Sequence, residues 1–239
     1  MLSNAVPQFN MRRRVLGPVC AKSRGGWYHS EAMTTIIDYH AGNLTSVRLA
    51  FEALGRPVEV SSDPARVRAA ERVVFPGVGA AASAMQNLRA LGLDGAIREV
   101  AAAGVPFLGI CLGTQILLDE SEEDGGTACL GIVAGAAARF RPRSHWEKVP
   151  QMGWNQVRQV RPHPVFRGIR DGADFYFVHS YYPVPASGEC VVATTEYCGV
   201  AFASSIGRGN VVATQFHPEK SGETGLALLE NFSRWDGKV

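Results

Sequence analysis

Short apolar segments in the first half of the chain alternate with segments of helical periodicity. Residues 34–39 (TTIIDY), 72–79 (RVVFPGVG) and 105–110 (VPFLGI) are typical of buried strands, and a helical segment follows each of them. This order favours a doubly wound, mostly parallel α/β sheet flanked by helices. Active sites in such sheets lie beyond the carboxyl ends of the strands, so the ends of these three segments are candidate positions for a site.

The second half of the chain has a different pattern. Its apolar segments are shorter, and several alternate with period two, which is typical of half-buried strands. Residues 204–214 (SSIGRGNVVAT) predict a hairpin with its turn at residues 207–210. The helices that we expect span residues 41–55, 80–92, 93–104, 113–123 and 224–235.

The first thirty residues differ from the rest in charge. They carry five basic residues and no acidic one, whereas the remainder has a net charge of −3. An Arg-rich, acid-poor segment is compatible with a transit peptide or with an extension upstream of a start at Met33. We favour the extension, because a strand pattern begins directly after Met33. Residues 1–32 are therefore expected to be disordered or non-native, and residues 33–239 to form one domain.

The composition is that of a soluble globular protein, with 46% hydrophobic and 19% charged residues. A net charge of +2 gives no case for nucleic acid, and no apolar run approaches the roughly 20 residues that cross a bilayer. None of the five cysteines forms a C-x-x-C pair or has metal-ligand spacing with a histidine. We therefore expect no metal site, no membrane contact and a reducing compartment, the cytoplasm.

Cys111 lies between two glycines, Gly109 and Gly113, where a strand pattern gives way to a helical one. This is the G-x-nucleophile-x-G pattern of a nucleophile elbow, with sulfur in place of the serine oxygen. Glycines on both sides remove side chains that would clash in the tight turn, and the positive end of the helix favours the thiolate. The alternative is a buried cysteine that packs as a small apolar side chain.

His217 is the histidine with the clearest catalytic context. It follows the apolar segment NVVATQF and precedes Glu219 by two residues, so both side chains point the same way in an extended segment. A carboxylate in that position would orient the imidazole as a general base. The alternative is a helix-start signal, which is compatible with the catalytic reading. Of the other histidines, His40 and His179 follow strands and could line a site, whereas His145 and His163 lie in Arg/Pro-rich segments typical of solvated loops.

The segment PGVG at residues 76–79 follows the strand RVVF. Its glycines would let main-chain N–H groups turn toward an anion. No P-loop pattern is present.

Taken in order, PGVG, GICLGTQ and QFHPEKSG resemble class I (triad) glutamine amidotransferases. Longer matches, IIDYHAGNLTSV, KVPQMGWNQV, YFVHSYY and TTEY, resemble the glutaminase subunits of imidazole glycerol phosphate synthases over about residues 33–235. The resemblance implies a flavodoxin-like fold and a role in histidine biosynthesis. In that role glutamine is hydrolysed through a cysteine thioester, and the ammonia passes to a separate (β/α)₈-barrel cyclase that makes imidazole glycerol phosphate and AICAR.

The resemblance also implies roles for individual residues. Cys111 would attack glutamine, His217 would protonate the leaving ammonia, and Glu219 would orient His217. Oxyanion and glutamine-binding residues would be Gly77, Val78, Gly79, Leu112, Gln115, Glu123, His179, Ser180 and Tyr181. The face that binds the cyclase would include Asn43, Trp154, Tyr176 and Lys220. No cofactor is implied.

Three other functions are weighed against this one. A glutaminase for another acceptor is disfavoured by PGVG and HSYY, and a non-enzymatic module is disfavoured by the intact triad positions. A cysteine peptidase would leave Gln115 and the docking residues unexplained. Two features depart from the family pattern: His40 stands where family members often carry glycine, and the basic leader has no counterpart.

Overall fold

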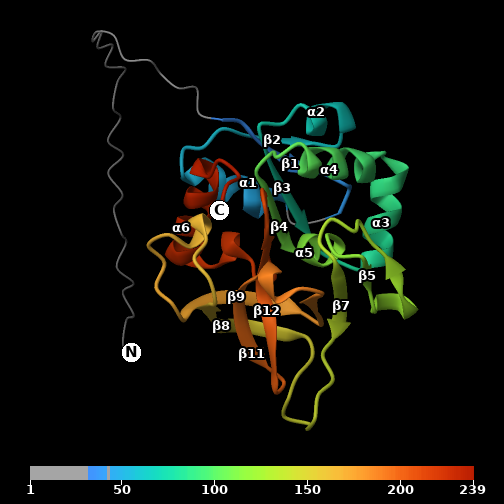
Figure 1. Ribbon diagram of the computed structural model, residues 1–239, viewed down its shortest axis with the longest axis vertical. Coiled ribbons are helices and arrows are strands. Elements are labelled where there is room, and N and C mark those ends of the chain that lie inside the picture. The colour runs from blue at the N-terminus through green and yellow to red at the C-terminus, as the bar shows by residue number, and fades with distance from the viewer. Residues whose placement is uncertain (1–31, 42–43) are drawn as a thin grey trace, which may run out of the picture. The chain divides into compact units, whose positions relative to one another are not determined.

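A mixed sheet of nine strands runs through the part of the chain that the structure, a computed structural model, describes: residues 32–41 and 44–239 (Figure 1). The predicted extension lies outside these residues except for Ala32. The strand order is β2 (Val58–Ser61), β1 (Thr34–Ile37), β3 (Arg72–Gly77), β4 (Phe107–Cys111), β13 (Val211–Thr214), β12 (Val200–Arg208), β11 (Val191–Tyr197), β8 (Gln151–Gln159) and β9 (Ala173–His179). The first five strands of this order, from β2 to β13, pair in parallel. The remaining pairings, from β13 through β12, β11 and β8 to β9, are antiparallel.

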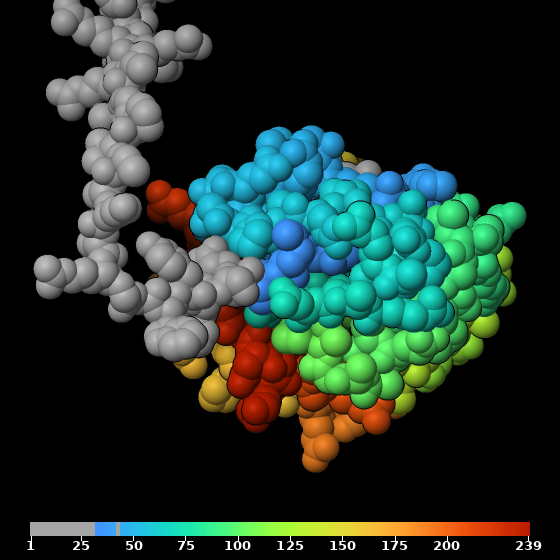
Figure 2. Space-filling model, turned by 90° about the horizontal axis from the view of Figure 1, so that it is seen from above, coloured from blue at the N-terminus to red at the C-terminus, as the bar shows by residue number. Residues whose placement is uncertain are grey.

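Helices cover both faces of the parallel strands, which confirms the predicted α/β fold. In β3, Val73 and Phe75 pack into one core and Val74 into the other. The first core includes α3 (Ala81–Ala90) and α4 (Leu93–Ala102), and the second includes α1 (Leu44–Ala53) and α6 (Gly222–Arg234). The short helix α2 (Pro64–Arg68) packs against α4. Early segments, blue to green, cover most of the face in Figure 2, and red residues of the C-terminal segment lie at its edge.

A second, smaller sheet follows the short helix α5 (Leu112–Ile116). Its strands are β10 (Tyr181–Pro185), β7 (Gly135–Arg139), β5 (Glu120–Ser121) and β6 (Thr127–Ala128). The helix predicted over residues 113–123 is therefore wrong beyond Ile116. The amides of Ile132 and Val133 donate to the carbonyl of Leu117, at 2.9 and 3.0 Å, so distant backbone takes the place of the next helical turn.

The predicted hairpin is confirmed, because β12 pairs antiparallel with β13 and the chain turns at residues 209–210. The predicted final helix corresponds to α6. None of the described helices is long and apolar enough to span a membrane.

His163 is buried, so its prediction as a solvated loop residue is wrong. The side chain is 5% exposed, and its Nδ1 accepts from the amide of Val165 at 3.3 Å at the start of a 3₁₀ turn, η2 (Pro164–Phe166). Trp235, from the far end of the chain, packs edge-on against the ring with centroids 5.0 Å apart. Burial, assisted by the positive charge of Arg161, lowers the pKa of His163 to about 4.

This buried neutral histidine should make stability depend on acidity. A folded-state pKa near 4 lies below the unfolded value near 6.5, so the stabilisation is present above pH 6.5 and is lost as the pH falls toward 4. Going from pH 7 to 5 should cost about 2 kcal/mol for this residue alone. Denaturant titrations of His163→Asn, which keeps a capping acceptor, should show a correspondingly smaller loss. An unchanged pH dependence would contradict this account.

Candidate active site

Cys111 occupies a strained turn between β4 and α5. Its φ of 54° and ψ of −111° lie outside the regions that residues with a side chain normally adopt. Close packing explains the glycines around it. A Cβ at Gly113 would lie 2.0 Å from the carbonyl oxygen of Phe75, and one at Gly109 would lie 2.9 Å from the Cβ of Ala213. The tight strand-to-helix turn predicted from the sequence is therefore present in the structure.

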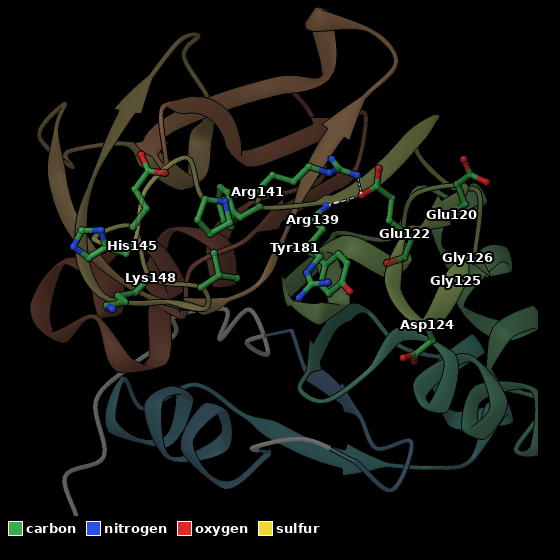
Figure 3. A pocket seen from close by; sticks show the side chains of 15 residues that line it. Glu120, Glu122, Asp124, Gly125, Gly126, Arg139, Arg141, His145, Lys148 and Tyr181 are labelled. Carbon is green, nitrogen blue, oxygen red and sulfur yellow. Dashed lines mark hydrogen bonds and ion pairs between the residues drawn. The ribbon is translucent and has the colours of Figure 1, made fainter.

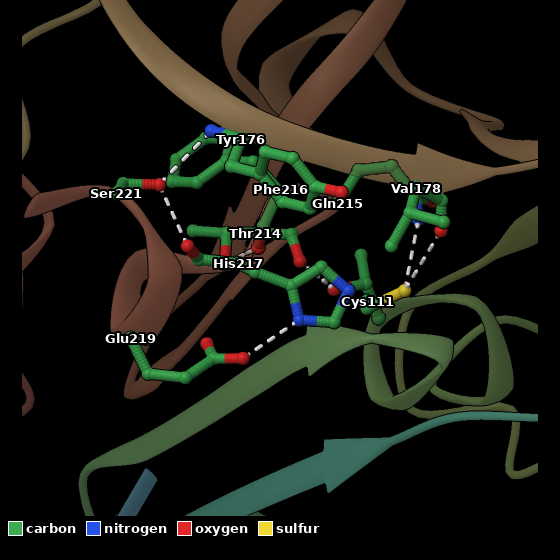
Figure 4. A network of polar contacts seen from close by, with 10 residues as sticks. Cys111, Tyr176, Val178, Thr214, Gln215, Phe216, His217, Glu219 and Ser221 are labelled. Atoms are coloured by element: carbon green, nitrogen blue, oxygen red, sulfur yellow. Dashed lines mark hydrogen bonds and ion pairs between the residues drawn. The ribbon is translucent and has the colours of Figure 1, made fainter. Parts of the chain in front are cut away.

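His217 and Glu219 form a buried pair at the end of β13. The imidazole Nδ1 donates to Glu219 Oε1 over 2.8 Å, and their side chains are 3% and 1% exposed. Glu219 lies in the 3₁₀ turn η4 (Pro218–Lys220), and the backbone of His217 is tied by its amide to the carbonyl of Tyr176 at 2.9 Å. Figure 4 shows the ring between the Glu219 carboxylate and Cys111. His217 Nε2 is buried and makes no hydrogen bond within the described residues.

The charges around His217 favour its protonated form. Burial opposes the positive charge, but the neighbouring Cys111 sulfur and the hydrogen-bonded Glu219 carboxylate outweigh burial and raise the pKa of His217 to about 10. Near neutral pH the site thus holds a proton on the imidazole, next to sulfur. Chemically, a sulfur beside a protonated imidazole can serve as a nucleophile with a proton donor for a leaving group.

A cavity of about 280 Å³ opens at Cys111 and His217. It is lined by seven of the nine residues predicted to bind the oxyanion or glutamine: Val78, Gly79, Leu112, Gln115, His179, Ser180 and Tyr181. A larger, open cavity of about 1320 Å³ shares Tyr181 with it and carries charges of both signs, among them the Arg141–Glu122 ion pair (Figure 3). The smaller cavity, which holds the sulfur and the imidazole, is the candidate active site.

Gly77 and Glu123 do not line this cavity. Gly77 lies behind it, where a Cβ would come within 2.8 Å of the Gly113 nitrogen. Glu123 accepts from the amide of Ala81, 2.6 Å away, at the start of the helix that follows PGVG. Burial raises the pKa of Glu123, against the effect of that hydrogen bond. Both residues therefore contact the backbone around the cavity and do not face its interior.

The amide of Val78, a predicted oxyanion donor, has a partner that the sequence did not indicate. It donates to the hydroxyl of Tyr39 over 3.3 Å. Tyr39 is fully buried, and burial raises its pKa to about 12. The phenol therefore stays neutral and keeps an acceptor next to the loop.

His179 lines the cavity as a rigid neutral side chain. Its Nδ1 donates to the carbonyl oxygen of Tyr181 over 2.7 Å, and its ring packs against Phe140, Phe177 and Phe202. Burial lowers the pKa of His179 to about 4, so the ring is uncharged at neutral pH. His40 does not line the cavity; it is exposed, with a φ of 63°.

Two of the predicted docking residues, Trp154 and Tyr176, lie side by side on the sheet. Trp154 of β8 is 59% exposed and is the register partner of Tyr176 of β9, with their rings edge to face. Met152, 66% exposed, is the register partner of Val178, which lines the cavity. This apolar surface therefore reaches from solvent to the wall of the site. Lys220 is exposed in η4, and Asn43 lies outside the described residues.

Sequence analysis did not single out Gln215. It is fully buried, and its Nε2 lies 3.7 Å from the Cys111 sulfur. Its position two residues before His217, on the same side of an extended segment, was a usable signal. Within the described residues, no group of three or more His, Cys, Asp or Glu side chains could hold a metal ion.

The family model for class I glutamine amidotransferases matches residues 35–234, which include all of these side chains. The chain belongs to this family. It is 57% identical over 197 residues to the imidazole glycerol phosphate synthase subunit HisH of Moorella thermoacetica, covering 82% of this chain and 92% of the relative. The HisH subunit of Dehalococcoides mccartyi strain CBDB1 is 51% identical, over 84% of this chain and 96% of that protein.

Solved structures agree with the fold. A glutamine amidotransferase from Thermotoga maritima superposes with a TM-score of 0.59 at 19% identity, over 84% of this chain and 82% of that one. The glutaminase domain of Trypanosoma brucei CTPS superposes with a TM-score of 0.53 at 15% identity, over 85% and 94% of the two chains.

Proposed function

We propose that this chain is the glutaminase subunit of an imidazole glycerol phosphate synthase and hydrolyses L-glutamine to glutamate and ammonia. The observation that carries the proposal is the buried His217–Glu219 pair, 2.8 Å apart, beside a cysteine held in a nucleophile elbow. The 57% identity to a HisH subunit, over 92% of that subunit's length, supports this synthase over a glutaminase that supplies ammonia to another acceptor.

The geometry supports a two-step reaction. The Cys111 thiolate attacks the carboxamide carbon of glutamine, and the C–N bond breaks as His217 Nε2 donates its proton to the leaving nitrogen, which departs as ammonia. The product is a γ-glutamyl thioester on Cys111. Water then attacks this thioester, His217 accepts the proton from water, and the C–S bond breaks to release glutamate. Glu219 keeps Nδ1 protonated, so that Nε2 faces the reaction.

In this proposal the 280 Å³ cavity holds the glutamine side chain. The amides of Val78 and Leu112 are the oxyanion donors, and Gly79, Gln115, His179, Ser180 and Tyr181 form its walls. Gly77, within PGVG, packs against the backbone of Gly113, and Glu123 holds the start of the helix that follows PGVG.

The hydrogen bond between the Val78 amide and the Tyr39 hydroxyl leads us to expect low activity in the isolated chain. A single N–H donates one strong hydrogen bond, so the Val78 amide that donates to Tyr39 must leave it before it can stabilise an oxyanion. The glycine after Val78, with a φ of 90°, permits such a change in the backbone. Binding of a partner would supply the free energy for it.

The partner that we propose is a separate (β/α)₈-barrel cyclase, bound in a heterodimer at the face with Trp154, Tyr176, Lys220 and Asn43. Exposed aromatic side chains are common anchors of interfaces. The apolar surface from Met152 to Val178 would exclude water along the path of the ammonia. The enzyme would need no cofactor and would work in the cytoplasm, with residues 33–239 as its functional domain.

Trapping the thioester tests the proposed chemistry. Acid quenching during turnover of the full chain with its cyclase partner should give a γ-glutamyl adduct on the peptide that contains Cys111, detected by mass spectrometry. His217→Asn should accumulate far less of it, because the leaving nitrogen then lacks a proton donor. An adduct on another residue, or none in the active wild-type complex, would refute the proposed route.

A further inference from the structure

Two buried glutamines connect the cavity wall to the nucleophile. Gln115 in α5 donates from Nε2 to the carbonyl oxygen of Tyr181 over 2.9 Å and to Gln215 Oε1 over 3.0 Å. Gln215, directly after β13, then donates from its own Nε2 to the Cys111 sulfur over 3.7 Å. Gln115 is 4% exposed and Gln215 is fully buried. The bond between the two glutamines and the bond to sulfur are therefore buried.

The hydrogen bond from Gln115 to the Tyr181 carbonyl fixes the direction of the other bonds. The Tyr181 carbonyl can only accept, so Gln115 must present its NH₂ group to it. The same NH₂ group faces Gln215, which must therefore turn its oxygen toward Gln115. This orientation leaves the NH₂ group of Gln215 on the sulfur side. His179 also donates to the Tyr181 carbonyl, over 2.7 Å, and so fixes the acceptor from which the chain of bonds begins.

We infer that Gln215 is a hydrogen-bond donor that stabilises the Cys111 thiolate, and that Gln115 is a positioning residue that sets the orientation of Gln215. The inference rests on the proposed role of Cys111 as nucleophile. Hydrogen bonds to a charged acceptor are about twice as strong as neutral ones, and a dry surrounding strengthens them further. The thiolate therefore has a further source of stabilisation besides His217 and the start of α5.

The same geometry limits what Gln115 can offer to a substrate. Both N–H groups of its amide are engaged, one by Tyr181 and one by Gln215. Only its carbonyl oxygen is left to accept a hydrogen bond from glutamine. If Gln115 contacts the substrate, it therefore does so as a hydrogen-bond acceptor.

The test measures the thiolate directly. The full chain is alkylated with iodoacetamide from pH 5 to 10, and modification of Cys111 is followed by peptide mass spectrometry. Gln215→Leu should lower the rate at pH 7 about tenfold, the equivalent of one lost hydrogen bond to a charged group, and should move the midpoint of the pH profile upward by about one unit. Gln115→Met should give a smaller shift in the same direction.

A second variant and a control separate this effect from a loss of packing. Gln215→Glu is nearly isosteric. It should react most slowly at pH 7, and its deficit in rate relative to the wild type should become smaller at low pH, where the protonated acid can donate again. Ser205→Ala removes another fully buried hydrogen bond, to the carbonyl of Ala213, without contacting Cys111, and should keep the wild-type profile. If Gln215→Leu does not fold, the alkylation profile of Gln215→Glu alone tests the inference.

Wild-type alkylation profiles in both Gln215 variants would overturn the inference, whatever their glutaminase activity. The shifted profiles would uphold it. Glutamine hydrolysis by the wild-type complex is assayed separately: its absence, together with shifted alkylation profiles, would refute the proposed function and leave the role of Gln215 standing.

Discussion

Replacing Cys111 by alanine should abolish glutamine hydrolysis by the complex while its synthesis from free ammonia continues. Without the sulfur no thioester forms, and the remaining groups cannot replace a nucleophile. Loss of a nucleophile costs roughly 10⁴-fold or more in comparable enzymes. Alanine fits the space of cysteine, so the fold and the docking face should be unchanged. The measurement compares imidazole glycerol phosphate formation with glutamine and with an ammonium salt as the nitrogen source.

Cys190→Ala is the matched control. Cys190 lies in the 3₁₀ turn η3 (Gly188–Cys190), is only partly buried and does not line the cavity at Cys111. This variant should keep both activities. Glutamine-dependent synthesis in Cys111→Ala, or loss of its ammonia-dependent synthesis, would contradict the division of labour between the subunits.

Gly113→Ala should prevent stable folding. The added Cβ would lie 2.0 Å from the Phe75 carbonyl oxygen, which belongs to the neighbouring strand β3 and cannot move without disturbing the centre of the sheet. Ordinary overpacking costs about 1–3 kcal/mol, and a clash with backbone at this distance should exceed about 4 kcal/mol. Denaturant titration of the isolated chain measures the loss.

Gly188→Ala provides the comparison for this substitution. Nothing lies within 4 Å of a Cβ at Gly188, so the same change there should alter stability by less than about 0.5 kcal/mol. Equal stabilities of the two variants would contradict the close packing of Gly113 against the Phe75 carbonyl.

The parallel half of the fold and the pairing of His217 with Glu219 were predictable because their signals are local. Buried strand patterns, glycine turns and the i, i+2 spacing of His217 and Glu219 all act over a few residues. The length of α5 was not predictable, because amides from residues 130–133 end it. The burial of His163 depends likewise on Trp235, far away in the sequence.

Two details of the site depend on tertiary packing. The direction of the Val78 amide is a property of one peptide plane, and its acceptor, Tyr39, comes from another strand end. The contact between Gln215 and sulfur depends on how far β13 and β4 extend side by side, although the spacing to His217 places Gln215 on the correct face. Residue type and spacing indicate which groups meet, and tertiary packing decides how they are oriented.

The most direct test of the proposed function is glutamine hydrolysis by this chain, alone and with the barrel cyclase and its ribonucleotide ligand. The engaged Val78 amide leads us to expect very little hydrolysis by the isolated chain and strong stimulation in the liganded complex. High hydrolysis by the chain alone, unchanged by the cyclase and its ligand, would contradict the account.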